Sequence, residues 1–171
     1  DIDSDNRTGA FFDKVGSGSY EPTAATPGGG ATLRALFTPG HEIDHTCYYL
    51  AQDKVMFTGD TVLGGSSSSV RDLSSYMQSL QLLVSFEADK VFPAHGTLVE
   101  NGTDYIRQYI EHRQQREKQV VAALSAGHTD VYAIVEYVYP KDLKAGLKEA
   151  AARNVRTHLH KLVVEGVARQ T

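Results

Sequence analysis

Hydrophobic and polar positions along this chain follow two different periods. Short apolar runs bounded by turn-forming residues occupy residues 31–37, 46–50 and 54–58, and this pattern predicts strands. The tripeptide "AQD" between the second and third runs predicts a tight hairpin connection. A fourth strand is expected over residues 90–92, where Pro93 ends it.

Helical spacing dominates much of the rest of the chain. Apolar positions repeat every three or four residues over 72–86, which predicts an amphipathic helix, and "GGSSSS" at 64–69 predicts a flexible loop before it. A longer helix is expected over about 103–125 and is stopped by Gly127. Its apolar stripe turns polar halfway, so we expect its two ends to pack against different bodies.

The last third of the chain predicts a small helical module. We expect helices over 130–139 and about 143–164, separated by Pro140, and a short strand "VARQ" after Gly166. Together with the end of the preceding long helix, these make three helices and a strand in a short segment, which is typical of a winged helix. The final helix carries an apolar stripe and a basic stripe, which are Leu147, Ala151, Val155, Leu159 and Leu162, and Lys144, Lys148, Arg156 and His160.

Charge is distributed unevenly along the chain. Residues 1–100 carry six Lys and Arg against thirteen Asp and Glu, whereas residues 141–171 carry seven against three. An acidic body with a basic tail is a weak indication of a polyanionic partner. We therefore consider Lys144, Lys148 and Arg156 as nucleic-acid contacts, with a plain solvated helix face as the alternative.

Cysteine content and hydropathy bear on the compartment. Cys47 is the only cysteine among 171 residues, which favours a reducing, intracellular setting, and we expect it to be a packed strand residue. No run approaches the roughly 20 apolar residues of a membrane span, and the start of the chain shows no signal-peptide pattern. Three further histidines are expected at the surface, namely His112, His128 and His158.

Three segments share one local form, in which a short strand is followed by a turn and then by a side chain able to bind a metal. "FTPGH" ends at His41, "FTGD" ends at Asp60, and "FPAH" ends at His95. Imidazole and carboxylate groups suit Zn²⁺, Fe or Mn, and one carboxylate can bridge two ions. An Asp at the end of a buried strand is costly unless a cation or several hydrogen bonds compensate it.

Each of these three residues also has a simpler explanation. A single histidine after a turn usually lies at the surface, and an Asp after Gly is usually a turn residue. Residue types and spacing by themselves leave the surface interpretation and the metal interpretation both open.

The three segments, in this order and at these separations, resemble the second half of the metallo-β-lactamase fold. The resemblance continues through "VLGG…DLSSYMQSL" and "YIRQYIEHRQQRE" and runs from about Ala31 to the C-terminus. These segments look like the subgroup of the mitochondrial β-lactamase-like endoribonuclease, which carries a C-terminal winged helix. Fungal thioesterases that release aromatic polyketides from a carrier protein look similar over the same stretch.

The resemblance implies an α/β fold, with residues 1–115 as the C-terminal half of an αββα metallo-β-lactamase sandwich and residues 116–171 as a winged-helix domain. It implies a site for two zinc ions in which His41 binds the first, His95 binds the second, and Asp60 bridges both as the catalytic carboxylate. Such a site activates water for attack on a phosphodiester or a thioester. A mitochondrial or cytoplasmic location is implied as well.

Asp44 and His45 lie beside the first of these segments. By resemblance they stand near the site without being metal ligands, which suggests that they orient the ligands. An exposed turn is the alternative.

The chain also departs from the family pattern. The remaining family ligands belong to a His-x-His-x-Asp-His motif that precedes "TPGH", and no histidine precedes His41 in this sequence. We therefore expect half of a catalytic domain plus the winged helix. The expected partner is the missing N-terminal half of the same domain, and this chain alone is expected to be inactive.

Three functions remain open from the sequence. The first is an endoribonuclease-like phosphodiesterase acting on RNA, motivated by the metal ligands and the basic stripe. The second is an acyl-carrier thioesterase of polyketide biosynthesis, motivated by the equal resemblance to the fungal enzymes. The third is a non-catalytic fragment or scaffold, motivated by the missing ligand motif. No membrane partner is expected.

Overall fold

The computed structural model describes residues 32–169, and within them the strands form one sheet in the order β1-β2-β3-β4-β5. Neighbouring strands are antiparallel except β3 and β4, which are parallel. The four predicted strands are confirmed, and β5 is a two-residue edge strand that the sequence pattern did not indicate. The strands are β1 (Leu33–Phe37), β2 (Thr46–Leu50), β3 (Val55–Gly59), β4 (Lys90–Pro93) and β5 (Val99–Glu100).

The predicted helices are confirmed with small changes at their ends. Asp72 caps the first of them by accepting a hydrogen bond from the Ser75 amide, and Asp130 caps the third in the same way through Tyr132 and Ala133. In the part of the chain that the structure describes, no helix combines the length and the apolarity needed to cross a bilayer. The helices are α2 (Leu73–Val84), α3 (Gly102–Ser125), α4 (Val131–Val138) and α5 (Ala145–Val164).

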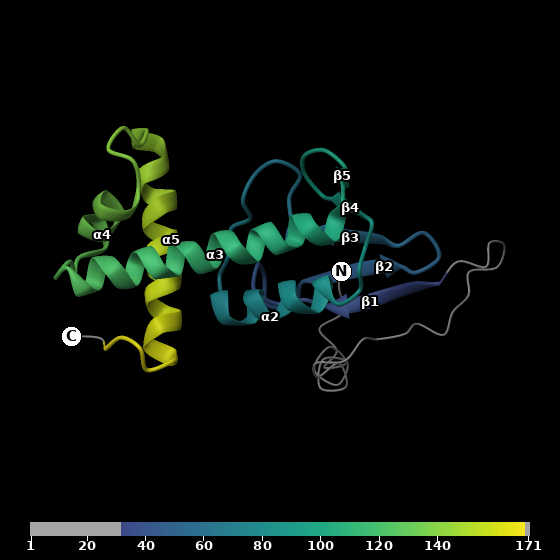
Figure 1. Ribbon diagram of the computed structural model, residues 1–171, viewed down its shortest axis with the longest axis horizontal. Helices are drawn as coiled ribbons and strands as arrows, with labels where there is room; N and C mark the ends of the chain where they lie inside the picture. The colour runs from purple at the N-terminus through teal and green to yellow at the C-terminus, as the bar shows by residue number, and fades with distance from the viewer. Residues whose placement is uncertain (1–31, 170–171) are drawn as a thin grey trace, which may run out of the picture.

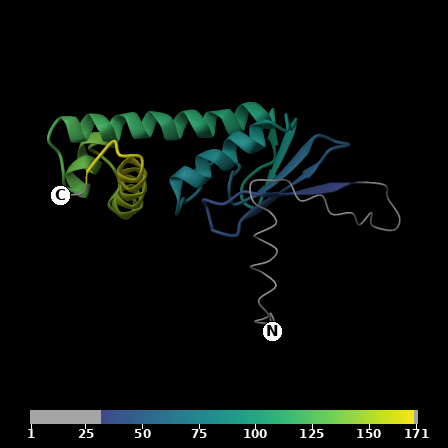
Figure 2. The same ribbon diagram turned by 90° about the horizontal axis from the view of Figure 1, so that it is seen from below.

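One face of the sheet is covered by α2 and the first half of α3 (Figure 2). Alternate residues of β1 to β4 point to this face and meet the apolar stripe of α2, as the period of two in strands and 3.6 in helices requires. Cys47 is fully buried here, as predicted. The fully buried core side chains include Leu36, Cys47, Met56, Tyr76, Leu80, Leu83, Val91 and Ile106.

The opposite face of the sheet is apolar but exposed. Tyr48 pairs with Phe57, and Phe57 with Phe92, so the three residues form a row across three strands. Their exposed fractions are 44%, 37% and 40%, and the Phe57 and Phe92 rings lie 5.4 Å apart. Aromatic side chains in such a row are normally covered by a second layer. We call this row the open face.

A second core lies at the far end of α3, where α4 and α5 pack against it and α5 crosses it (Figure 1). The expectation that the two ends of α3 pack against different bodies is therefore confirmed. One continuous helix runs through the expected domain boundary at residues 115 and 116. The buried residues of this second core are Val120, Ala123, Ile134, Val135, Ala151, Ala152, Val155 and Leu162.

Three expectations for the C-terminal part are wrong. Val167–Arg169 is not a strand, and the last two residues of "VARQT" lie outside the described residues. Leu147, expected in the apolar stripe of the last helix, is 52% exposed because the first turn of α5 extends beyond the core. His158, expected at the surface, is 1% exposed.

Candidate metal centre

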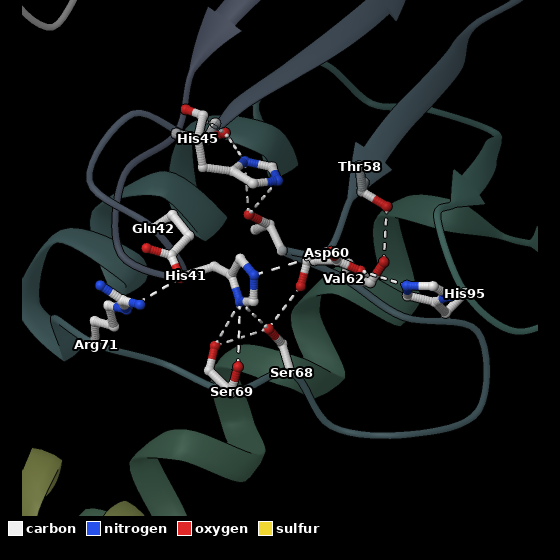
Figure 3. Close-up of polar contacts among 12 residues, drawn as sticks. His41, Glu42, His45, Thr58, Asp60, Val62, Ser68, Ser69, Arg71 and His95 are labelled. Carbon is white, nitrogen blue, oxygen red and sulfur yellow. Dashed lines mark hydrogen bonds and ion pairs between the residues drawn. The ribbon is translucent and has the colours of Figure 1, made fainter.

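His41, Asp60 and His95 come together at one edge of the sheet (Figure 3). They follow β1, β3 and β4, and these three strands run in the same direction because β2 is antiparallel to both of its neighbours. Their carboxyl ends therefore meet at the same edge. The topology thus brings together three residues that are 19 and 35 positions apart in the sequence.

Asp60 lies between the two histidines and turns one carboxylate oxygen towards each. Its Oδ2 is 4.0 Å from Nε2 of His41, and its Oδ1 is 3.5 Å from Nε2 of His95. Oδ1 is buried and has no hydrogen-bond partner among the described residues. A buried carboxylate oxygen without a partner is costly, so this atom has an unused capacity to accept a hydrogen bond or to bind a cation.

The His41 ring is fixed in one orientation by two serines. Nδ1 is 2.8 Å from the carbonyl oxygen of Ser69, and since a carbonyl can only accept, Nδ1 carries the proton. The lone pair of the neutral ring is then on Nε2, the atom that faces Asp60. The Ser68 hydroxyl donates to the carbonyl oxygen of Asp60 at 2.6 Å and also lies 3.2 Å from Nδ1.

Backbone hydrogen bonds set the position of His95, whose own side chain is 77% exposed. The Ala94 amide donates to the carbonyl oxygen of Gly59, and the Gly64 amide donates to that of His95, both at 2.9 Å. Gly64 and Gly96 approach so closely that a Cβ on Gly96 would overlap the carbonyl oxygen of Gly64. The loops that carry Asp60 and His95 are thus joined through their main chains.

His45 fills the space behind the His41 turn. Its Nδ1 is 3.0 Å from the hydroxyl oxygens of both Thr38 and Thr61, and a Cβ on Gly59 would lie 2.7 Å from its Nε2. Burial, and then the nearby His41 ring, lower the pKa of His45, so the ring is held neutral. Gly59 has a φ of 52°, which only glycine adopts without cost in so confined a place.

Asp44 is placed differently from His45. It is exposed, and its carboxylate forms no hydrogen bond or ion pair with the described residues. The charge of Asp44 raises the pKa of His45, but burial of the His45 ring lowers this pKa by more. Contacts therefore support an orienting position for His45 and an exposed turn for Asp44.

The three residues fit a shared metal centre only in part. Two donors on one tetrahedral zinc ion are about 3.4 Å apart, given bond lengths near 2.1 Å. The His95–Asp60 separation of 3.5 Å matches this value, and the His41–Asp60 separation of 4.0 Å is slightly wider. Within residues 32–169, no three or more His, Cys, Asp or Glu side chains converge on one point that could hold an ion. The donor set is one carboxylate with a single histidine on each side.

The loop over residues 64–69, which was predicted to be flexible, is held, together with Leu63, by a row of side chains on α3. The hydroxyl of Tyr105 accepts from the Gly65 amide at 3.0 Å, and that of Tyr109 accepts from the Leu63 amide at 3.0 Å. Arg113 donates to the carbonyl oxygen of Ser68 at 2.6 Å. The three α3 residues are spaced by four positions, and this was the signal in the sequence that could have identified them.

The residues of the basic stripe expected on the last helix do not share one exposed helix face. Ala152 lies in the same series and is fully buried, because steps of four residues rotate by about 40° around a helix of 3.6 residues per turn. Arg156 donates to Glu149 at 2.9 Å and is therefore paired. Lys144 precedes the first turn of α5, and Lys148 lines a cavity of about 450 Å³ with Lys141 and Tyr137.

Two protein families match this chain. The family described as the metallo-beta-lactamase superfamily matches residues 6–95, which is more than half of the chain and includes the three strand-end residues. The family described as the beta-lactamase associated winged helix domain matches residues 131–171, which contain α4 and α5.

Two curated relatives illustrate how much of this chain is matched. An atrochrysone carboxyl ACP thioesterase of Aspergillus fumigatus is 47% identical over 95 residues, which cover 56% of this chain and 30% of the relative. The beta-lactamase-like protein 2 homolog of Caenorhabditis elegans is 34% identical over 140 residues, which cover 81% of this chain and 47% of the relative. The chain thus spans less than half the length of these relatives.

Solved structures agree with the fold. A beta-lactamase domain protein from Burkholderia ambifaria matches 86% of this chain and 47% of its own, with a TM-score of 0.74 and 24% identity. A metallo-beta-lactamase family protein from Thermus thermophilus matches 88% and 48%, with a TM-score of 0.66 and 23% identity. The fold class expected from the sequence is confirmed.

Proposed function

Because this chain belongs to the metallo-beta-lactamase superfamily, we propose that it is part of a metal-dependent hydrolase with two zinc ions. His41 would hold one ion through Nε2, His95 would hold the other, and Asp60 would bridge them. One observation carries the proposal, namely that the two oxygens of a single carboxylate face the Nε2 atoms of two different histidines.

The residues of this chain have distinct tasks in such a site. The zinc ions, when bound, supply Lewis acidity and activate water at neutral pH. Asp60 would hold an ion with each of its carboxylate oxygens, and its buried Oδ1 would thereby gain the partner that it lacks among the described residues. The Ser69 carbonyl oxygen keeps the proton of His41 on Nδ1 and thereby keeps Nε2 free to bind.

An acyl thioester attached to a carrier protein is the substrate class that we favour. The support is the 47% identity, over 95 residues, to a relative named as an ACP thioesterase. The basic stripe that motivated an RNA substrate is interrupted by Ala152, and Arg156 is paired with Glu149. An RNA phosphodiester is the second candidate, favoured by Lys141, Lys148 and the exposed Tyr137 around one cavity.

The remaining ligands and the second sheet would come from another part of the same protein. The open face supports this, because its exposed aromatic row is the surface on which a second layer of a sandwich packs. Catalytic zinc takes three protein ligands per ion, and one histidine with half of a carboxylate is short of that number. The partner that we propose is therefore the N-terminal half of the same domain.

The experiment uses the complete protein that contains this chain. Zinc content is measured by elemental analysis, and hydrolysis is followed on a small acyl thioester and on a single-stranded RNA. Asp60→Asn, His41→Ala and His95→Ala should each reduce thioester turnover by about 100-fold or more and reduce bound zinc, since each removes a ligand. Turnover of RNA alone would reverse the order of the two substrate classes.

Matched control variants separate loss of a ligand from loss of a charge. Asp53→Asn changes an exposed aspartate in the β2–β3 turn, and His160→Ala changes an exposed histidine of α5. Both should leave zinc content and turnover unchanged. A protein in which Asp60→Asn retains full turnover and two zinc ions would contradict the proposed function.

A further inference from the structure

Arg113 is a buried arginine that contacts both halves of the structure. It lies in the middle of α3 and is 4% exposed, and its guanidinium stacks 5.5 Å from the centre of the Tyr76 ring. One terminal nitrogen donates to the carbonyl oxygen of Ser68 at 2.6 Å. The other lies 3.5 Å from Oδ1 of Asn154 in α5.

The loop atom that Arg113 holds is close to the proposed metal ligands. Ser68, whose carbonyl oxygen accepts from Arg113, donates through its hydroxyl to the main chain of Asp60 at 2.6 Å. The next carbonyl oxygen along the chain, that of Ser69, accepts from Nδ1 of His41 at 2.8 Å. A shift of this two-residue segment would therefore move a support of Asp60 and a support of His41 together.

The C-terminal helical unit reaches the same segment from the other side. Asn154 approaches Arg113, and the Thr157 hydroxyl lies 3.4 Å from the carbonyl oxygen of Val70. Both residues belong to α5, which crosses α3 (Figure 1). The loop is thus bounded by α3 along one side and by α5 at its end.

Burying a guanidinium here has a cost that packing alone does not explain. Its Nε is buried and forms no hydrogen bond with the described residues, although a methionine of similar length would fill the space without that penalty. What the arginine provides, and an apolar side chain cannot, is a planar group with donors aimed at two different elements.

We propose that Arg113 is a positioning residue for the metal centre and that Asn154 couples the C-terminal helical unit to it. The inference rests on the proposed function for the identity of the centre. Through Arg113 the helical unit fixes the Ser68–Ser69 segment, and this segment fixes the direction of His41 Nε2 and the main chain of Asp60. The helical unit then has a role in building the metal centre, whatever substrate it contacts.

The test compares Arg113→Met, Arg113→Lys and Asn154→Ala with the control Arg116→Met in the complete protein. Arg116 stacks on Tyr139 at 4.1 Å and donates to Val138, so it binds the helical unit without touching the loop. Zinc affinity is measured by competition with a chromophoric chelator, and hydrogen exchange is measured for the amides of residues 64–71.

Arg113→Met should weaken zinc binding by about tenfold and speed exchange in the loop, as loss of an outer support does in metal sites. Arg113→Lys should restore part of both effects, because an ammonium still donates to Ser68, and Asn154→Ala should have a smaller effect of the same sign. Arg116→Met should change neither readout, even where it lowers the melting temperature.

Two results would overturn the inference. One is unchanged zinc affinity and loop exchange in Arg113→Met, and the other is an equal change in Arg116→Met, which would indicate general destabilisation. If wild-type protein binds no zinc, the proposed function fails, and the exchange measurement then decides the role of Arg113 by itself. If Arg113→Met does not fold, Asn154→Ala decides by the same two readouts.

Discussion

The two regions of the structure that α3 connects, the sheet and the C-terminal helical unit, differ in how far their charged side chains are paired. At the sheet edge, the main chain is tied down by hydrogen bonds, while Asp60 and two histidine nitrogens face one another without direct hydrogen bonds. In the helical unit, the charges are paired, as Arg156 with Glu149 and Lys161 with Glu117 show. The proposed metal centre thus lies where the backbone is fixed and where polar side-chain atoms lack hydrogen-bond partners.

Glycine-to-alanine substitutions should give the largest difference in stability between the sheet edge and the helical unit. Gly64→Ala would place a Cβ 2.1 Å from the Thr97 carbonyl oxygen, whereas a Cβ on Gly146 in α5 meets nothing within 4 Å. Gly64→Ala should destabilise by about 3 kcal/mol and separate the Asp60 and His95 loops. Gly146→Ala should stabilise by about 0.5 kcal/mol because it restricts the unfolded chain.

Denaturant unfolding and zinc titration of the complete protein would check both substitutions. Gly64→Ala should lose zinc binding even where it remains folded, and Gly146→Ala should keep it. Normal stability and zinc affinity in Gly64→Ala would show that the main-chain connection between the two loops is not what builds the centre.

Buried histidine in the helical unit should make stability depend on pH. Burial, followed by the charges of Arg113, Arg116 and Lys161, lowers the pKa of His158 from 6.5 to about 3. These effects outweigh Glu117, whose carboxylate is 3.8 Å from Nδ1. Below pH 6.5, His158 is protonated in the unfolded chain but stays neutral in the folded chain. The free energy of unfolding therefore decreases as the pH drops towards 3.

His158→Leu should remove this part of the pH dependence while keeping the volume of the side chain roughly constant. The measurement is the free energy of unfolding at several pH values between about 3 and 7.5, compared with the exposed-histidine variant His160→Ala. A wild-type slope that survives in His158→Leu would assign the pH dependence to carboxylates instead.

The smallest expected effect concerns the exposed lysines of the helical unit. Lys144→Ala combined with Lys148→Ala should leave thioester turnover within about twofold of wild type, because neither lysine contacts the sheet edge. The salt dependence of RNA binding provides the comparison, with Lys118→Ala on α3 as the control. If the double variant reduced the slope of log affinity against log salt by roughly two units, both lysines would be phosphate contacts and RNA would become the favoured substrate.

Local patterns in the sequence predicted the elements well where short-range physics decides them. The strands over 46–50 and 54–58 are short apolar runs on either side of a tight turn, and α2 has both a regular apolar stripe and a capping Asp72, so their positions agree with the structure. The prediction of a strand over "VARQ" was wrong. A segment this short forms a strand only where another strand pairs with it, and local sequence does not show whether such a partner is present.

Long-range contacts explain why other residues were missed. Ser68 belongs to a run of serines that predicted flexibility, yet it is 3% exposed, because Arg113, 45 positions later, holds its carbonyl oxygen. Likewise the residues of the basic stripe are spaced by multiples of four, which suggested a single helix face. Ala152 occupies the middle position of this series and is buried in the core, so the series does not lie on one exposed face.

Local sequence was enough to single out His41, Asp60 and His95, their order and the family that they resemble, because turn chemistry and ligand type are local properties. The folded chain was needed to show which carboxylate oxygen faces which histidine, which nitrogen of His41 carries the proton, and which buried side chains hold the loop between them. Those features depend on the shared direction of β1, β3 and β4 and on the path of α3 and α5, which bring residues distant in sequence within hydrogen-bonding distance.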